Sequence, residues 1–134
     1  MKIAHIITKL ELGGAQLNTV YTVNYFASKN CEVVLIHGSG GILDKSLIDK
    51  RVKLIEIKQL QREINPLYDL IALIKIYLIL KNNRFDIVHT HSSKAGILGR
   101  LAASAAGIQK IFHTIHGWGF NPLQSKAAYT TYVI

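Results

Sequence analysis

Four histidines fall in two short segments, His89-Thr-His91 and His113-Thr-Ile-His116. A neutral imidazole can hydrogen-bond to a sugar hydroxyl or accept its proton. We expect His116 to do such chemistry, because it lies in a glycine-flanked loop beyond a strand, the alternative being that it only bonds locally within that loop. His91 either does the same or only caps the helix that follows it. Lys94 either holds an anionic group or is a solvated side chain.

A pair of glycines, Gly13-Gly14, precedes a helical pattern of apolar residues and follows an apolar strand. Glycines let the backbone approach a ligand closely, and a helix start offers free N–H groups and the positive end of the helix dipole. This arrangement suits a phosphate. A plain strand-to-helix turn is the alternative, and the glycine pair alone does not decide between the two.

Several other chemistries are disfavoured by the sequence. His89, His91, His113 and His116 together could bind zinc, but no acidic residue or cysteine accompanies them, so we expect no metal. The chain has no G-x-G-x-x-G loop, no acid after its second strand and no P-loop, which disfavours dehydrogenases and P-loop enzymes. It also lacks G-x-S-x-G, and Cys31 begins a strand at the opposite edge, so nucleophilic Ser or Cys catalysis has no support.

The histidine segments belong to a strand, a helix and a second strand. Asp86–His91 and Lys110–Ile115 are β-branched runs, and Ser93–Ala106 is a helical stretch with a serine N-cap and Gly107 as its stop. The two strands of such a unit are parallel, so His91 and His116 emerge at the same edge of the sheet.

The remaining pattern alternates strands with helices in the same way. It predicts a doubly wound parallel α/β sheet in three layers, with strand order 3-2-1-4-5 and the first and fourth strands as neighbours. Gly13-Gly14, His91 and His116 would then line one crevice. The other expected elements are strands at Lys2–Thr8, Cys31–His37 and Val52–Ile57, a short helix at Asp44–Asp49, and a helix over Leu67–Leu80 that starts at Pro66.

Length and charge limit the class of protein. The 134 residues make one domain, and a net charge of +8 favours an anionic partner, although no nucleic-acid-binding motif is visible. No signal peptide is apparent, and the single cysteine fits a reducing cytoplasm. Leu67–Leu80 is too short to cross a bilayer, which takes about 20 residues, so we expect a crossover helix buried against the sheet. Its excess apolar surface also allows contact with a membrane surface or a partner. Ala127–Ile134 begins a new element, so we expect the chain to be the first part of something longer.

Three motifs carry a resemblance to a known family: Gly13-Gly14-Ala15-Gln16, the run from Asp86 to Gly96, and Thr114-Ile-His-Gly-Trp-Gly-Phe120. Over nearly its whole length the chain resembles the N-terminal domain of retaining glycosyltransferases of the GT-B fold, in family 4, which serves capsule, exopolysaccharide and O-antigen synthesis. The resemblance implies two Rossmann-like domains facing a cleft, with the acceptor mainly on this domain and the nucleotide-sugar donor on a C-terminal domain that is absent.

The resemblance also implies roles for single residues. Gly13 and Gly14 would approach the donor diphosphate, and His116 would lie near the reacting sugar. His91, Lys94 and Gly117 would line the acceptor side. Such enzymes need no metal or cofactor besides the nucleotide sugar.

The same resemblance sets expectations for the whole protein. The acceptor would be a glycan or a lipid-linked sugar. Because the chain is basic and Leu67–Leu80 is apolar, we expect the protein to be cytoplasmic or peripheral on the inner face of the membrane. We expect negligible transfer by the isolated chain, because positioning across the cleft is lost. A sugar-nucleotide epimerase of the same two-domain build and a non-catalytic binding module remain as alternatives.

Overall fold

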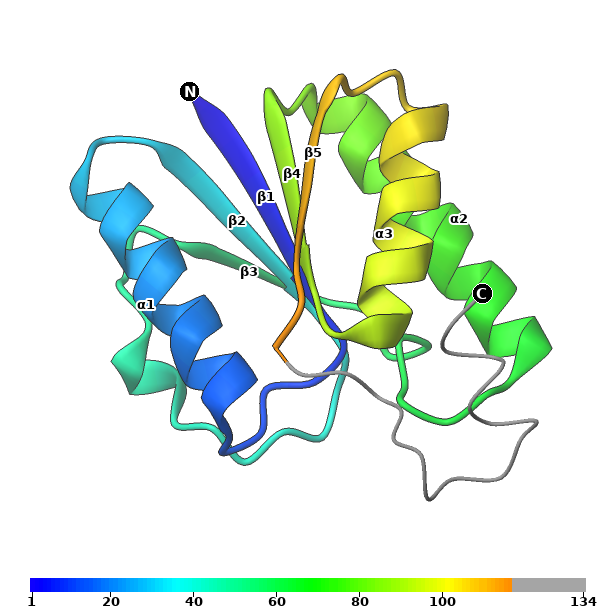
Figure 1. The fold of residues 1–134 in the computed structure, drawn as a ribbon, viewed down its shortest axis with the longest axis horizontal. Helices are drawn as coiled ribbons and strands as arrows, with labels where there is room; N and C mark the ends of the chain where they lie inside the picture. Colours follow the sequence, from blue (N-terminus) through cyan, green and yellow to red (C-terminus); the bar gives the residue numbers. More distant parts are fainter. Residues whose placement is uncertain (117–134) are drawn as a thin grey trace.

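A computed structural model describes residues 1–116 of the chain as an α/β domain around a five-stranded parallel sheet (Figure 1). The strand order is β3-β2-β1-β4-β5, as the sequence predicts. Gly117 and Ala127–Ile134, about which the sequence makes predictions, lie outside the described residues. The elements are β1 (Lys2–Ile7), α1 (Gly14–Ser28), β2 (Glu32–His37), η1 (Lys45–Leu47), β3 (Lys53–Glu56), α2 (Pro66–Asn83), β4 (Ile87–His91), α3 (Ser93–Ala105) and β5 (Lys110–Thr114).

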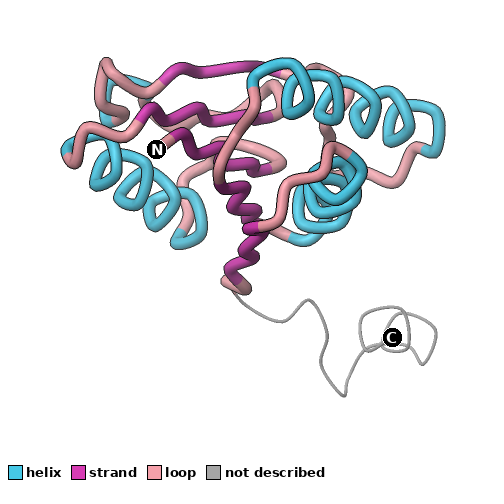
Figure 2. The backbone as a smooth tube through the Cα atoms, turned by 90° about the horizontal axis from the view of Figure 1, so that it is seen from above, coloured by secondary structure: helices cyan, strands magenta, loops and turns pink. Residues whose placement is uncertain are grey.

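The helices cover the two faces of the sheet unequally, and Figure 2 shows this in a view from above. On one face α1 packs through Val20 and Val23 against Ile7 and Leu35 of the central strands. On the other face α2 and α3 pack side by side over a larger apolar core. β1 and β4 are paired at the centre of the sheet, where the order of strands reverses. The three predicted layers are therefore confirmed.

Local sequence accounts for most of the helix ends. α2 starts at Pro66, and the Asn65 side chain accepts a hydrogen bond from the Tyr68 N–H at 3.2 Å. Gly107 follows α3 with φ at +81°, a left-handed conformation that glycine adopts without strain. The predicted short helix is only a single turn, η1, which begins after Asp44, whose carboxylate accepts from the Ser46 N–H.

The predicted serine cap of α3 is wrong in detail. The residue at the cap position is Ser92, which has φ at +67°, and its hydroxyl makes no capping hydrogen bond to the helix. It lies 2.8 Å from the hydroxyl of Thr8 at the end of β1 instead. The serine therefore ties two neighbouring strand ends together.

Candidate functional site

The candidate site lies at the carboxyl edge of the sheet, where β1, β4 and β5 end. The loop after β1 leads to Gly13 and Gly14, Ser92 follows β4, and His116 lies two residues beyond β5. Because all strands are parallel, these three segments meet at one edge, beside the point where the strand order reverses. The prediction that the glycine pair, His91 and His116 share an edge is confirmed.

The N-terminus of α1 is open. Gly13 has an extended backbone, and no side chain of the described residues caps the first turn, which also carries no acidic residue. A Cβ added at Gly14 would meet no atom within 4 Å. The first N–H groups of α1 and the positive end of its dipole are thus available to an anion.

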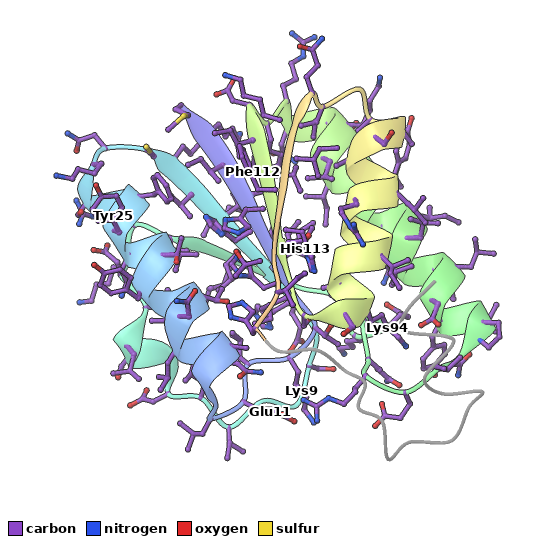
Figure 3. The ribbon with its side chains drawn as sticks, in the orientation of Figure 1. Lys9, Glu11, Tyr25, Lys94, Phe112 and His113 are labelled. Atoms are coloured by element: carbon purple, nitrogen blue, oxygen red, sulfur yellow. The ribbon has the colours of Figure 1, made fainter. Side chains whose placement is uncertain are left out.

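The loop that leads to this helix is held by charged and polar contacts. The Gln16 amide donates to the Lys9 carbonyl at 3.1 Å, which folds the loop back on the first turn of α1. Glu11 forms ion pairs with Lys9 at 3.2 Å and with Arg62 at 2.7 Å. Lys9 and Glu11 are labelled in Figure 3, where they lie at the same end of the molecule as Lys94. Glu11 therefore neutralises part of the charge of the two cations in this region.

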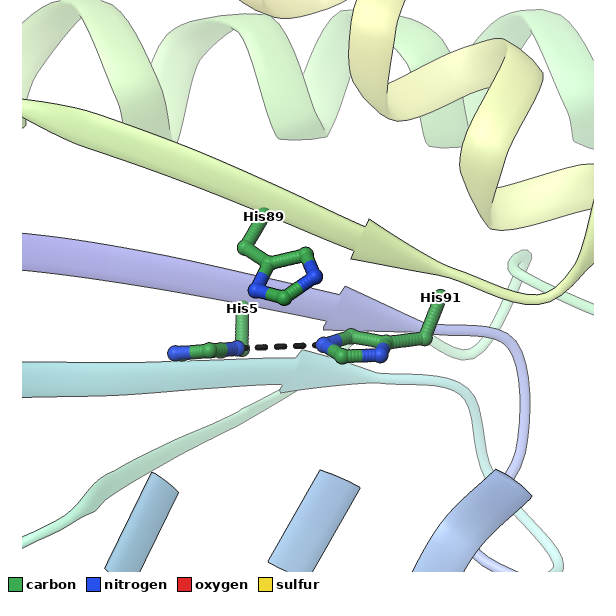
Figure 4. Close-up of side chains that lie close together, drawn as sticks. All are labelled: His5, His89 and His91. Atoms are coloured by element: carbon green, nitrogen blue, oxygen red, sulfur yellow. Dashed lines mark hydrogen bonds between the residues drawn. The ribbon is translucent and has the colours of Figure 1, made fainter. Parts of the chain in front are cut away.

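Three imidazoles form a row on the α1 side of the sheet. His5 Nδ1 lies 3.1 Å from His91 Nε2, and His91 Nδ1 lies 3.1 Å from His116 Nε2. The first of these contacts is drawn in Figure 4. His5 and His91 have no exposed surface, whereas His116 is partly exposed. The row therefore runs from the interior of the sheet to the edge where the ligand would bind.

Burial keeps these rings uncharged. It lowers the pKa of His5 to about 3, with a smaller contribution from the nearby His89. Burial likewise lowers the pKa of His91 to about 2, helped by His89 and His5. The pKa of His116 is also lowered by burial. Near neutral pH each ring is therefore a neutral imidazole with one N–H and one lone pair.

The other two histidines of the sequence motifs have structural partners. His89 Nε2 lies 2.6 Å from the Thr114 hydroxyl, and His113 Nδ1 lies 2.9 Å from the Thr90 hydroxyl. Figure 3 shows Phe112 and His113 pointing to opposite sides of β5, with His113 toward α3. His113 also packs against Gly96, where an added Cβ would come within 2.5 Å of its ring. The zinc set considered from the sequence is therefore split between the two faces.

A different trio, His5, His89 and His91, brings one nitrogen from each ring to within 4.8 Å of the others. The His89 and His91 rings, however, are stacked, with centroids 4.2 Å apart and planes at 29°. A metal ligand offers its lone pair in the plane of the ring, and stacked rings do not converge on one point. The trio also includes no carboxylate or thiolate. The geometry favours packed imidazoles, and the absence of a metal stays a prediction.

Lys94 makes contacts within the domain. Its ammonium lies 2.8 Å from an Asp69 carboxylate oxygen and also donates to the Glu63 carbonyl, and its side chain is only 13% exposed. It thus links the first turn of α3 to the first turn of α2. To hold an anionic acceptor, Lys94 would have to share its charge with Asp69. The predicted acceptor roles of His91 and Lys94 remain predictions, and His91 would reach an acceptor only through His116.

Sequence reasoning missed two residues of this edge, His5 and Thr8. His5 is the one polar residue in the run Ile3–Ile7, and it pairs in register with His89. That isolated histidine in a buried strand was the available signal. Thr8 Oγ1 accepts from the Ala95 N–H at 3.2 Å, so it fills the N-terminus of α3.

This open parallel sheet, whose strand order reverses between β1 and β4, is a Rossmann-like α/β domain. The chain belongs to Glycosyltransferase Family 4, whose model matches residues 12–133. It is 36% identical over 132 residues to the Escherichia coli UDP-Gal:alpha-D-GlcNAc-diphosphoundecaprenol alpha-1,3-galactosyltransferase, and the match covers 98% of this chain and 34% of that protein. The chain thus spans about a third of the length of this curated relative.

Solved structures agree with this assignment. A glycosyltransferase from Rickettsia africae is 27% identical, with a TM-score of 0.68 over 91% of this chain and 31% of that one. The UDP-GlcNAc 2-epimerase of Methanocaldococcus jannaschii has a TM-score of 0.65 at 16% identity, over 99% of this chain and 36% of that one. At that identity the likeness to the epimerase shows the fold alone. The family therefore favours glycosyl transfer over epimerisation.

Proposed function

We propose that this chain is the acceptor-side half of a glycosyltransferase that moves a sugar from a nucleoside diphosphate to a glycan or lipid-linked acceptor. Family membership supports the reaction class. The name of the Escherichia coli relative specifies a UDP-sugar donor and a lipid diphosphate acceptor, and we propose the same classes here. The structural observation that carries the proposal is the open N-terminus of α1, at the sheet edge that holds His116.

In this proposal the donor diphosphate lies against the first turn of α1. The bond between the sugar and the diphosphate breaks, a bond to the acceptor oxygen forms, and negative charge grows on the departing diphosphate. Backbone N–H groups at Gly14 and beyond stabilise that charge without the help of a metal. His116 hydrogen-bonds to the reacting sugar. We accordingly expect a chelator such as EDTA to leave the rate unchanged.

A second, donor-binding domain outside this chain completes the proposed site. The chain alone should bind substrates weakly and transfer no sugar, since the reacting groups must be held together across a cleft. We would therefore assay the chain alone and as a fusion with the two thirds of the Escherichia coli relative that it does not cover. UDP-galactose and a GlcNAc-diphospholipid are the substrates.

The expected result is galactosyl transfer by the fusion and none by the chain alone. His116→Ala in the fusion should reduce the rate at least a hundredfold, which corresponds to about 2.7 kcal/mol of lost transition-state stabilisation. Tyr21→Ala, on the exposed side of α1, is the matched control and should leave the rate unchanged. Release of free sugar and UDP without an acceptor would favour the epimerase alternative. Full activity of the His116→Ala fusion would favour a different site.

We also propose that α2 binds the membrane surface, where a lipid-linked acceptor would lie. Leu67, Leu70, Ile74 and Leu78 recur at helical spacing and are each about half exposed or more, so they form an apolar stripe. Lys81 follows the stripe at the end of the helix, which suits anionic headgroups. None of the helices within residues 1–116 has the length and hydrophobicity that a membrane span requires.

Vesicle co-sedimentation tests this second proposal. The chain should sediment with vesicles that contain anionic lipid and less with neutral vesicles. Leu70→Gln with Ile74→Gln should abolish the binding. Tyr21→Gln with Tyr25→Gln, which removes exposed aromatic side chains from α1, is the matched control. Equal sedimentation of the stripe variant and the wild type would exclude α2 as the contact.

A further inference from the structure

The row of imidazoles suggests a role for His5 and His91, the two rings that have no exposed surface. We propose that His91 is a positioning residue. With His5 it forms a chain of neutral rings in which each ring donates toward the sheet edge, so that His116 accepts at Nε2 and carries its own proton on Nδ1. The proposal depends on the two 3.1 Å contacts that join His5 to His91 and His91 to His116.

The direction of the hydrogen bonds between these imidazoles follows from a count of N–H donors. A neutral His91 has one N–H and one lone pair, and both of its nitrogens are in contact with another ring, so it donates to one neighbour and accepts from the other. If His91 donated to His5, the proton of His5 would be on Nε2. That nitrogen is buried and has no hydrogen-bond partner among the described residues. A buried N–H without a partner is rare and costly.

The neighbouring ring of Phe26 does not remove this cost. Its centroid lies 6.2 Å from that of His5, and the two planes are inclined by only 34°. An N–H lies in the plane of its own ring, so it would need a nearly perpendicular neighbour to point at an aromatic face. The favoured arrangement therefore puts the His5 proton on Nδ1, directed at His91, and leaves Nε2 as an unprotonated nitrogen.

The consequence for His116 is a defined role. With Nε2 occupied by the His91 N–H, its other ring nitrogen is the one left for a substrate, and that nitrogen is a donor. His116 would then recognise an oxygen lone pair, on a sugar hydroxyl or a diphosphate, and would not act there as a base. This consequence rests on the proposed function, whereas the direction of the imidazole chain does not.

Long-range ¹H–¹⁵N spectra of the ring nitrogens of the 134-residue chain at pH 7 measure the direction, since protonated and bare nitrogens have separate shifts. The expected pattern is N–H at Nδ1 and a bare Nε2 for all three of His5, His91 and His116. The reverse pattern for His91 and His116 would overturn the proposal. No substrate is needed, so the outcome is independent of whether the chain belongs to an active transferase.

Variants test whether His91 controls His116. His91→Phe should convert His116 to a mixture of tautomers, and His91→Gln, which keeps a donor at this position, should restore the single tautomer in part. His5→Phe is a second variant in case a change at His91 prevents folding, and it should shift His116 in the same sense. The matched control is His89→Phe, on the same strand face and stacked on His91 but outside the chain of contacts. An unchanged His116 tautomer in His91→Phe would contradict the proposal.

Two further measurements separate this proposal from its rivals. Stoichiometric Zn²⁺ should leave the His5 and His91 signals in place, and a shift of both would assign the pair to a metal site instead. In the fusion protein His91→Phe should lower kcat/KM about tenfold, with His91→Gln between it and the wild type. A rate unchanged by His91→Phe would refute the positioning role while leaving the transferase proposal intact.

Discussion

Two strand-to-helix turns lie next to each other at the carboxyl edge of the sheet, and they are built in opposite ways. After β1 the chain takes six residues, Thr8–Gly13, before α1 begins. After β4 the single residue Ser92 leads directly into α3. At the long turn no side chain within the described residues caps the N-terminus of α1, whereas at the short turn the Thr8 hydroxyl occupies the N-terminus of α3.

The first turns of α3 are occupied by groups of the protein. The Ala95 N–H donates to Thr8 Oγ1, and Gly96 and Gly99 lie against side chains of the sheet. At α1 the corresponding positions carry no capping side chain. A helix N-terminus attracts an anion only where no protein group already occupies it. The comparison therefore supports the proposal that a phosphate lies at Gly13-Gly14 and gives the first turn of α3 a packing role.

Acidification should have the largest effect on stability, through two buried rings that lie on the strands before these turns, His5 on β1 and His91 on β4. The pKa values of His5 and His91 are lowered from 6.5 to about 3 and about 2, so below pH 6.5 the unfolded chain binds protons that the folded chain does not. The free energy of unfolding should thus fall as the pH falls. An unfolded histidine takes up most of its proton between pH 7 and pH 5, so over this range the loss is about 2 kcal/mol for each ring and about 4 kcal/mol for both.

Urea unfolding at pH 7 and pH 5 measures this loss. The same comparison in His5→Phe should show a shallower pH dependence, because one of the two buried rings is gone. A wild-type stability that does not change over this range would mean that the rings are not buried and neutral as described.

Gly99→Ala should have the next largest effect. Its added Cβ would lie 2.6 Å from Thr90 Cγ2 and 3.1 Å from Ile6 Cδ1, both on buried, β-branched side chains of the sheet. Overlap of this kind costs about 1–3 kcal/mol, against up to about 1 kcal/mol gained when alanine replaces a helical glycine. We expect the free energy of unfolding to fall by about 1–2 kcal/mol, as measured by urea unfolding at pH 7. A variant as stable as the wild type would show that α3 is not packed closely on β4.

Thr8→Val should cost about 1 kcal/mol of stability, because it removes the hydroxyl that lies between Ser92 and the Ala95 N–H. Valine has nearly the same shape, so the change tests the hydrogen bonds and not the packing. Amide hydrogen exchange should become faster at Ala95 but not in the first turn of α1. Thr22→Val on α1, whose hydroxyl donates to a backbone carbonyl, is the matched control. Unchanged exchange at Ala95 would argue against the hydrogen bond from the Ala95 N–H to the Thr8 hydroxyl.

The strand order and the shared edge were predictable, because both follow from local pattern and chain direction. Strand runs such as Glu32–His37 alternate with helical runs, and right-handed crossovers leave few topologies. The glycine pair and the histidine segments could therefore be placed at one edge from the sequence. Family resemblance added the reaction class, which the comparisons then supported.

The partners of the site residues were not predictable from the sequence. His91 looked like an edge residue, but the pairing of β1 with β4 brings His5 beside it and buries both. Lys94 looked solvated or ligand-binding, but the packing of α3 on α2 brings Asp69 to it from 25 residues away. Both contacts depend on register and helix packing across distant segments, and a one-dimensional pattern does not contain them.

Gly14→Ala should have the smallest effect on stability and the clearest effect on binding. Its Cβ meets nothing within 4 Å, so the free energy of unfolding should change by less than about 0.5 kcal/mol. If a diphosphate lies against this turn, the methyl group should weaken the binding of UDP to the fusion protein about tenfold, as measured by calorimetry. Leu17→Ala, an exposed change one turn further along α1, is the matched control and should leave binding unchanged. Unchanged UDP affinity in Gly14→Ala would show that the diphosphate does not lie against the first turn of α1. The two turns would then no longer differ in function.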